Sequence, residues 1–160
     1  MNNPLNKLLI KRPTLNTLIM SRESAENFIY DKKYILISII TPHLSEANLK
    51  RDSNRVDLLR LEFNDIENKL FGSSLTVFNK TMAAKIWKFV SKNVDKISTI
   101  VVHCDMGISR SSGVAYAITL NIISKDRSDI ILNMSSYRPN NLVIKILNES
   151  FKELVIPDNF

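Results

Sequence analysis

The sequence predicts a single α/β domain with a central, mainly parallel sheet flanked by helices. Apolar runs that suit buried strands alternate with segments that suit helices along most of the chain. The length of 160 residues is typical of one domain, and the chain has only three glycines and five prolines, so long linkers are not expected. We therefore expect residues 1–160 to fold as one unit.

The first half of the chain is predicted to contain three strands and one helix. Tyr34–Ile40 is apolar almost throughout, which is typical of a strand buried on both faces of a sheet. Leu15–Met20 and Val56–Phe63 are also predicted strands, the second with a partial alternation of apolar and polar residues. A helix is expected to begin at Ser21, whose side chain can cap it, and to run to about Tyr30.

The second half is predicted to contain a central strand, Ile97–Val102, and four helices. In Asn79–Asn93 the apolar residues follow a helical stripe, and Trp87 lies off this stripe, where we expect it to cover the edge. Ser111–Ile123 is apolar on nearly every side, as expected of a helix that is buried against a sheet. The two remaining helices are predicted at Ser128–Ser135 and Asn141–Leu154.

Composition restricts the kinds of partner and the cellular location. The net charge of +6 suits an anionic ligand, but the basic residues form no dense block, so nucleic-acid binding is permitted and not required. The longest uncharged stretch, Ser111–Ser124, is too short to span a bilayer, and the first residues lack a signal-peptide pattern. The single cysteine suits a reducing compartment. We expect a cytoplasmic protein without membrane association, and no pattern specifies an oligomeric state.

A cysteine and an arginine, five residues apart, connect the predicted strand Ile97–Val102 to the helix that follows it. A helix N-terminus presents unpaired backbone N–H groups and a positive dipole end, which together bind anions. Gly107 allows a tight turn, and Arg110 can donate two parallel hydrogen bonds to one phosphate. Cys104 beside these groups is expected to be a thiolate. The segment therefore predicts a phosphate-binding loop that contains a nucleophile.

The remaining residues of this loop have assigned roles as well. The residues predicted to bind phosphate are Asp105, Met106, Gly107, Ile108, Ser109 and Arg110. The side chain of Asp105 is expected to point outward to solvent, because a carboxylate repels phosphate. Ser111 can hydrogen-bond the sulfur of Cys104 and is also a candidate N-cap of the helix. The alternative interpretation is that Cys104 is an ordinary buried core thiol.

The segment from His103 to Ser111 resembles the signature of the cysteine-dependent protein tyrosine phosphatases, His-Cys-x-x-Gly-x-x-Arg-Ser/Thr, with every fixed position filled. The resemblance is strongest over residues 56–154 and is closest to small dual-specificity-like phosphatases. It implies a phosphatase-like fold with the catalytic loop between a central strand and a buried helix. It also implies that Cys104 is the nucleophile, that Arg110 and Ser111 are catalytic, and that His103 orders the loop.

Phosphatases of this kind also need a general acid, for which Asp65 is the first candidate. Phe63-Asn64-Asp65-Ile66 follows a predicted strand and resembles the acid loop of dual-specificity phosphatases. The separation from Cys104, 104 − 65 = 39 residues, is somewhat long, and the excess can be placed in Leu70–Leu75. The alternatives are that Asp65 caps a turn, or that the acid is one of three other carboxylates, namely Asp57, Glu62 and Glu67.

A second resemblance concerns Tyr137-Arg138-Pro139-Asn140, which is similar to an Arg-x-Pro-Asn region of the same family. In that family the asparagine packs near the phosphate loop, so Asn140 is expected to have a supporting, structural role. No metal site is expected, because His43, His103 and Cys104 lack the spacing of zinc ligands, and no cofactor is expected.

The function predicted from these residues is hydrolysis of a phosphomonoester through a phosphocysteine intermediate, with a phosphorylated protein as the first candidate substrate. Asp105 argues against a phosphoinositide phosphatase, whose loop is expected to be basic. Two alternatives remain. One is a nucleotide or RNA 5′-phosphatase that uses the same loop, and the other is a module that binds phosphorylated partners without hydrolysing them.

Overall fold

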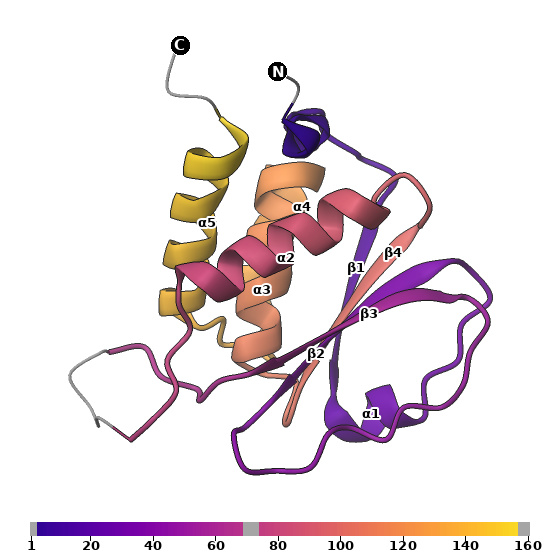
Figure 1. The fold of residues 1–160 in the computed structure, drawn as a ribbon, viewed down its shortest axis with the longest axis vertical. Coiled ribbons are helices and arrows are strands. Elements are labelled where there is room, and N and C mark those ends of the chain that lie inside the picture. Colours follow the sequence, from indigo (N-terminus) through magenta and orange to yellow (C-terminus); the bar gives the residue numbers. More distant parts are fainter. Residues whose placement is uncertain (1–2, 69–73, 157–160) are drawn as a thin grey trace.

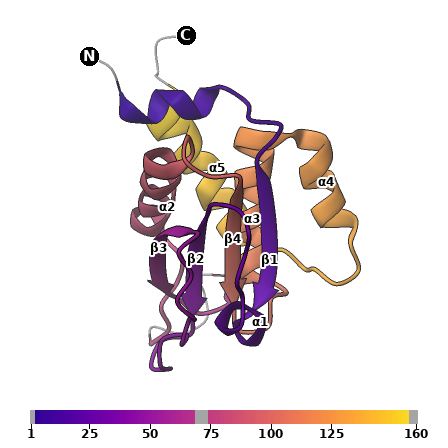
Figure 2. The same cartoon turned by 90° about the vertical axis from the view of Figure 1, so that its right-hand side faces the viewer.

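The computed structural model describes residues 3–68 and 74–156, which contain one four-stranded sheet (Figure 1). The strands are β1 (Asn16–Ser21), β2 (Tyr34–Ile40), β3 (Arg55–Glu62) and β4 (Thr99–Cys104). Their order in the sheet is β1-β4-β2-β3, and every neighbouring pair is parallel. Figure 2 shows the four strands side by side in this order. The predicted α/β architecture with a parallel central sheet is thus confirmed.

Helices cover both faces of the sheet, as a parallel sheet requires. All the helical elements given below except α1 contribute buried residues to the larger core, and α1 lies on the opposite face with the segment that follows β2 (Figures 1 and 2). The helical elements are η1 (Pro4–Leu9), α1 (Arg22–Glu26), α2 (Lys80–Asn93), α3 (Arg110–Ile118), the π-helical turn η2 (Thr119–Ile123), α4 (Lys125–Asn133) and α5 (Asn141–Val155).

Strand β2 is buried along its whole length, which explains its uninterrupted apolar sequence. Ile35, Ile37 and Ile39 belong to the core beneath the helices, whereas Tyr34 and Leu36 belong to the smaller cluster on the opposite face. This alternation follows from the period of two in a strand. One apolar run therefore supplies both cores.

Several element boundaries agree with the sequence prediction. Strand β2 has the predicted bounds, and α2 begins one residue after Asn79, whose side chain accepts a hydrogen bond from the N–H of Met82 as an N-cap. Ser21 caps α1 through the N–H of Ser24, as predicted. The predicted continuation of α1 to Tyr30 is wrong, because the helix ends at Glu26 and the chain turns so that the aromatic rings after it stack near Tyr34.

Three further expectations need correction. Trp87 does not cover the edge of a stripe, because its ring is fully buried and its indole N–H donates to the carbonyl of Leu147 at 3.0 Å. The predicted helix Ser111–Ile123 changes to π-helical hydrogen bonding at Thr119. Helix α4 begins before the predicted Ser128, since Ser124 caps it.

In residues 3–68 and 74–156, no helix is both long enough and apolar enough to span a membrane.

Candidate active site

Cys104 is the last residue of β4, at the carboxyl end of the parallel sheet. The strand extends two residues beyond the predicted end, so His103 and Cys104 both belong to it. The side chain of Cys104 is buried, and its Sγ accepts a hydrogen bond from the N–H of Gly107 at 3.3 Å. The Oγ of Ser111 lies 3.0 Å from the same sulfur. Two polar hydrogens can therefore stabilise negative charge on this sulfur.

Gly107 is needed for the conformation of the loop. It has a φ of +71°, a region that residues with a side chain rarely adopt. A Cβ at this position would lie 2.7 Å from the carbonyl carbon of Met20 and 2.7 Å from the backbone nitrogen of Ser21. The loop thus packs directly against the end of β1. The N–H of Arg22 also donates to the carbonyl of Asp105 at 3.2 Å.

The start of α3 differs from the prediction by one residue. The N-cap is Ser109, whose side chain makes no capping hydrogen bond, and Arg110 is the first helical residue. The prediction that Ser111 caps the helix is therefore wrong. Ser111 lies in the first turn and is fully buried, so its hydroxyl faces the sulfur.

Arg110 is almost completely buried, and its side chain is held by three neighbours. Its Nη1 donates to the Oγ1 of Thr41 at 3.0 Å and to the carbonyl of Phe63 at 2.8 Å. Its Nη2 donates to Asp105 Oδ2 at 2.9 Å. The Nε of Arg110 is buried and has no partner among the described residues. An unpaired buried N–H is costly and indicates a position where a ligand completes the hydrogen bonding.

The side chain of Asp105 does not point outward to solvent, so that expectation is wrong. Its Oδ2 accepts hydrogen bonds from Arg110 and, at 2.6 Å, from Thr41 Oγ1. Burial would raise the pKa of Asp105, but the hydrogen bonds from Thr41 and Arg110 outweigh it, and the pKa lies below its ordinary value. The carboxylate turns toward Arg110 because a buried guanidinium needs a charged partner.

Thr41 was not recognised in the sequence, although it bonds both charged side chains. It directly follows β2 and so lies at the same carboxyl edge of the sheet as Cys104. Its place directly after a predicted strand could have identified Thr41 in the sequence, because polar residues that follow parallel strands lie together at one edge of the sheet.

Asp65 lies in the same pocket as Cys104 and Arg110. Its Oδ1 accepts a hydrogen bond from Ser109 Oγ at 2.8 Å and another from Asn140 Nδ2 at 2.8 Å. Asn140 also caps α5, since its Oδ1 accepts from the N–H of Val143 at 3.0 Å. The sequence resemblance around Asn140 thus corresponds to a contact between α5 and the segment that carries Asp65.

The alternative carboxylates have other surroundings. Asp57 binds Lys92 at 3.1 Å and Asn93 at 3.0 Å, and Glu67 accepts from the backbone N–H of Asn141 at 3.0 Å. Glu62 is an exposed residue at the end of β3. The proposed insertion at Leu70–Leu75 lies mostly outside the described residues.

The pocket has a volume of about 190 Å³ and an apolar rim. Met106 is 72% exposed and Ile108 is 39% exposed, so both apolar side chains are accessible at the pocket. The residues lining the pocket are Asp65, Cys104, Met106, Ile108, Ser109 and Arg110. In residues 3–68 and 74–156, no three His, Cys, Asp or Glu side chains are grouped so that they could hold a metal ion.

Comparison with solved structures places this geometry in a known fold. The structure of PTPMT1 matches with a TM-score of 0.53 and 18% identity, covering 87% of this chain and 91% of that one. Human DUSP28 matches with a TM-score of 0.51 and 12% identity, covering 89% and 94%. Tk-PTP in the active form matches with a TM-score of 0.52 and 12% identity, covering 86% and 90%.

The chain has the fold of the cysteine-dependent tyrosine phosphatases. No protein-family model matches the chain, and no curated protein matches it. At these identities the likeness concerns the fold, while the arrangement of Cys104, Arg110 and Asp65 comes from the geometry above.

Within this phosphatase fold, His103 is fully buried next to Cys104 near the end of β4. Its Nε2 lies 2.6 Å from Ser38 Oγ, and its Nδ1 lies 3.2 Å from the carbonyl oxygen of Cys104. Burial is the main cause that lowers the pKa of His103, so the ring is neutral at neutral pH. The supporting role of His103 stays a prediction, and these contacts are compatible with it.

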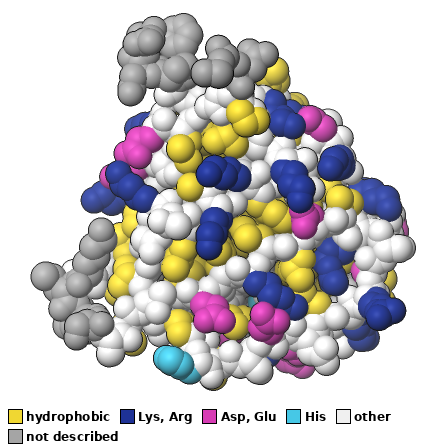
Figure 3. Space-filling view, viewed as in Figure 1, with side chains coloured by type: hydrophobic (Ala, Val, Ile, Leu, Met, Phe, Trp, Pro, Cys, Tyr) yellow, Lys and Arg dark blue, Asp and Glu magenta, His cyan; other side chains and the backbone are white. Residues whose placement is uncertain are grey.

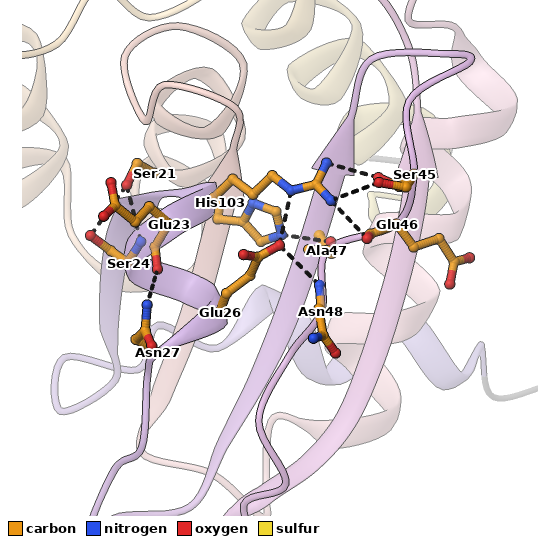
Figure 4. Close-up of polar contacts among 12 residues, drawn as sticks. Ser21, Glu23, Ser24, Glu26, Asn27, Ser45, Glu46, Ala47, Asn48 and His103 are labelled. Atoms are coloured by element: carbon orange, nitrogen blue, oxygen red, sulfur yellow. Dashed lines mark hydrogen bonds and ion pairs between the residues drawn. The ribbon is translucent and has the colours of Figure 1, made fainter.

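A polar network on the α1 face of the phosphatase fold connects that helix to the segment after Thr41 (Figure 4). Arg22 Nη1 donates to the carbonyl of Ser45 at 2.8 Å, and its Nε pairs with Glu26 at 3.0 Å. The same Glu26 carboxylate accepts from the N–H of Asn48 at 3.0 Å. Because the backbone N–H of Arg22 also donates to the carbonyl of Asp105, α1 joins the loop after β4 to the segment that carries Thr41.

Proposed function

We propose that this protein hydrolyses phosphomonoesters through a phosphocysteine intermediate, as a protein tyrosine or dual-specificity phosphatase. The observation that carries the proposal is a pocket lined by Cys104 and by a buried Arg110 whose Nε has no hydrogen-bond partner in the part of the chain that the structure describes. An arginine in this state is suited to bind a phosphate beside the sulfur. The fold of the chain supports the same chemistry.

In the first step, the Cys104 thiolate attacks phosphorus. A P–S bond forms while the ester P–O bond breaks, and Asp65 donates its proton to the departing oxygen. The backbone N–H groups of the loop and Arg110 stabilise the charge on the equatorial oxygens. The product of this step is phosphocysteine and a free alcohol or phenol.

In the second step, water attacks the phosphocysteine. The Asp65 carboxylate accepts a proton from the water, an O–P bond forms, and the P–S bond breaks. The electron pair returns to sulfur, where the Ser111 hydroxyl at 3.0 Å and the Gly107 N–H at 3.3 Å stabilise the thiolate. Phosphate then leaves and the site is restored.

The composition of the loop supports a phosphoprotein over a phosphoinositide. Between Cys104 and Ser111 the only basic residue is Arg110, and Asp105 partly neutralises its charge. Met106 and Ile108 give the rim an apolar character that suits an aromatic leaving group. PTPMT1 has been solved in complex with PI(5)P and matches with a TM-score of 0.54 at 17% identity. A phosphoinositide therefore belongs among the substrates tested.

The decisive experiment is a substrate profile of the purified protein with an aryl phosphate, a phosphotyrosine peptide and a phosphothreonine peptide. Wild-type protein is expected to hydrolyse the aryl phosphate, and Cys104→Ser is expected to lose at least about a thousandfold in turnover. Because Cys104 is the only cysteine, stoichiometric alkylation with iodoacetate should inactivate the protein at this site alone. Equal turnover by Cys104→Ser would overturn the proposal.

Two further substrates separate the alternatives. A triphosphate-ended RNA tests the 5′-phosphatase function, which the net charge of +6 permits. On the face in Figure 3, however, Lys and Arg side chains are interspersed with acidic and apolar ones, so that face offers no continuous track for a nucleic-acid backbone. Tight binding of a phosphopeptide to the wild-type protein without phosphate release would identify a binding module instead.

A further inference from the structure

We propose that Asp105 and Thr41 are positioning residues that hold Arg110 so that one edge of its guanidinium stays free for phosphate. We call these two side chains the arginine clamp. The inference goes beyond the fold and deepens the proposed function, on which it rests, by assigning a role to a carboxylate inside a phosphate-binding loop.

The clamp is a closed triangle of hydrogen bonds. Arg110 donates from Nη1 to Thr41 Oγ1 at 3.0 Å and from Nη2 to Asp105 Oδ2 at 2.9 Å. Thr41 in turn donates to the same Oδ2 at 2.6 Å. Since Thr41 and Asp105 are in contact with each other, they occupy the edge of the guanidinium that lies between Nη1 and Nη2. The remaining hydrogen of Nη1 is used by the carbonyl of Phe63 at 2.8 Å.

These three hydrogen bonds leave two N–H groups of Arg110 available for a ligand. A guanidinium has five N–H groups, and three of them are used by Thr41, Phe63 and Asp105. The two left are the buried Nε–H, which has no partner within residues 3–68 and 74–156, and the second hydrogen of Nη2. These two lie parallel on one edge, the arrangement that binds two oxygens of one phosphate. The clamp thus selects which edge of Arg110 is offered to the ligand.

The placement of Asp105 explains how a carboxylate is tolerated here. Its side chain is 24% exposed and is not among those lining the pocket, whereas Arg110 does line it. Its Oδ2 already accepts hydrogen bonds from Thr41 and from Arg110, so this oxygen is used within the clamp. The pKa of Asp105 lies below its ordinary value even though burial opposes this, so the clamp is charged at neutral pH. A buried cation without such a partner is strongly destabilised.

Both ends of the clamp are secured from the α1 side of the sheet. The backbone N–H of Arg22 donates to the carbonyl of Asp105 at 3.2 Å, and its guanidinium holds Ser45, a few residues after Thr41 (Figure 4). Arg22 Nη2 also donates to the carbonyl of Glu46 at 2.8 Å. The segment that carries Thr41 therefore cannot move away from Asp105 without breaking these contacts.

The test compares Asp105→Asn and Thr41→Val with Asp31→Asn, an exposed control that removes the same charge as the first variant. The kinetic constants kcat and KM are measured for an aryl phosphate, and the affinity for inorganic phosphate is measured by calorimetry. Asp105→Asn is expected to lower kcat/KM and phosphate affinity about ten- to hundredfold, the usual range for side chains in contact. Thr41→Val should have a smaller effect in the same direction, and Asp31→Asn none.

A double-mutant cycle separates positioning from a general loss of structure. If Asp105 acts through Arg110, then Asp105→Asn should cost little further activity or phosphate affinity in an Arg110→Lys background. Effects that simply multiply in the double variant would overturn the inference. So would an Asp105→Asn protein with normal phosphate affinity and normal kcat/KM.

Failure of the inference is distinguishable from failure of the proposed function. Wild-type protein that does not hydrolyse any phosphomonoester, but binds inorganic phosphate with an affinity that depends on Asp105, would support the clamp and contradict the phosphatase. Wild-type protein that hydrolyses the aryl phosphate with no dependence on Asp105 would contradict the clamp alone.

Discussion

The loop that carries Cys104 and the segment that carries Asp65 meet in one pocket but are held there in different ways. The loop, residues 104–110, joins the buried strand β4 to the buried helix α3, and Gly107 packs against the backbone of β1. Asp65 belongs to a segment without regular structure and is exposed. Hydrogen bonds from Ser109 and Asn140 hold its carboxylate.

This difference matches the chemistry proposed for each part. A nucleophilic sulfur, and an arginine that stabilises a transition state, act best when they are fixed in advance. A residue that donates and then accepts a proton needs contacts that exchange with the substrate. The following predictions test the two parts separately, the loop with the strand before it and the segment that carries Asp65. They are given from the largest expected effect to the smallest.

Gly107→Ala should have the largest effect on activity. The new Cβ would lie 2.7 Å from backbone atoms of Met20 and Ser21 in a conformation with φ of +71°, so the loop must shift. We expect a loss of about a hundredfold or more in kcat/KM, since small misplacements in an active site have effects of this size. A destabilisation of about 1–3 kcal/mol should appear in urea unfolding. An active, fully stable Gly107→Ala protein would show that the loop is not rigid.

Asp65→Asn should lower kcat by about a hundredfold or more, which is the usual contribution of general acid catalysis. The loss should be smaller for substrates whose leaving group needs no proton, and the pH profile of kcat/KM should lose the limb controlled by the acid. Glu62→Gln and Glu67→Gln serve as controls. If one of these two variants shows the large loss instead, the assignment of Asp65 is wrong.

Ser109→Ala and Asn140→Ala should have intermediate effects and differ from each other. Both remove one hydrogen bond to Asp65 and should lower kcat several-fold. Asn140→Ala also removes the N-cap of α5, so only this variant should lose about 0.5–2 kcal/mol of unfolding free energy. Steady-state kinetics and urea unfolding of both proteins measure the contrast. Unchanged kcat in both would mean that Asp65 needs no such support.

His103→Gln should have the smallest effect on activity and a clear effect on pH dependence. The pKa of His103 is lowered from 6.5 by burial, so the unfolded chain takes up the proton first as pH falls. The wild-type protein should therefore lose stability below about pH 6.5. Glutamine can keep the contact to Ser38 but cannot be protonated, so the variant should lose less stability between pH 7 and pH 5. Urea unfolding at both values measures this, and equal losses would contradict it.

The elements that could be predicted from the sequence are those in which local pattern and tertiary environment agree. Tyr34–Ile40 was located with its correct bounds because a strand buried on both faces needs apolar residues throughout. The predicted cap at Ser21 is confirmed because capping depends on neighbouring residues only. Trp87 was misplaced, since the stripe pattern contains no information about how α5 crosses α2.

The sequence alone placed Cys104 and Arg110 between a strand and a helix, because a strand-loop-helix with this spacing is a local structure. Only the tertiary structure decided that Asp105 turns toward Arg110, that Thr41 from another strand joins them, and that Asn140 reaches Asp65. These contacts connect residues up to 75 positions apart. They exist because parallel strands bring their carboxyl ends to one edge of the sheet. A buried charge at that edge, here Arg110, is stabilised by the polar side chains that lie beside it.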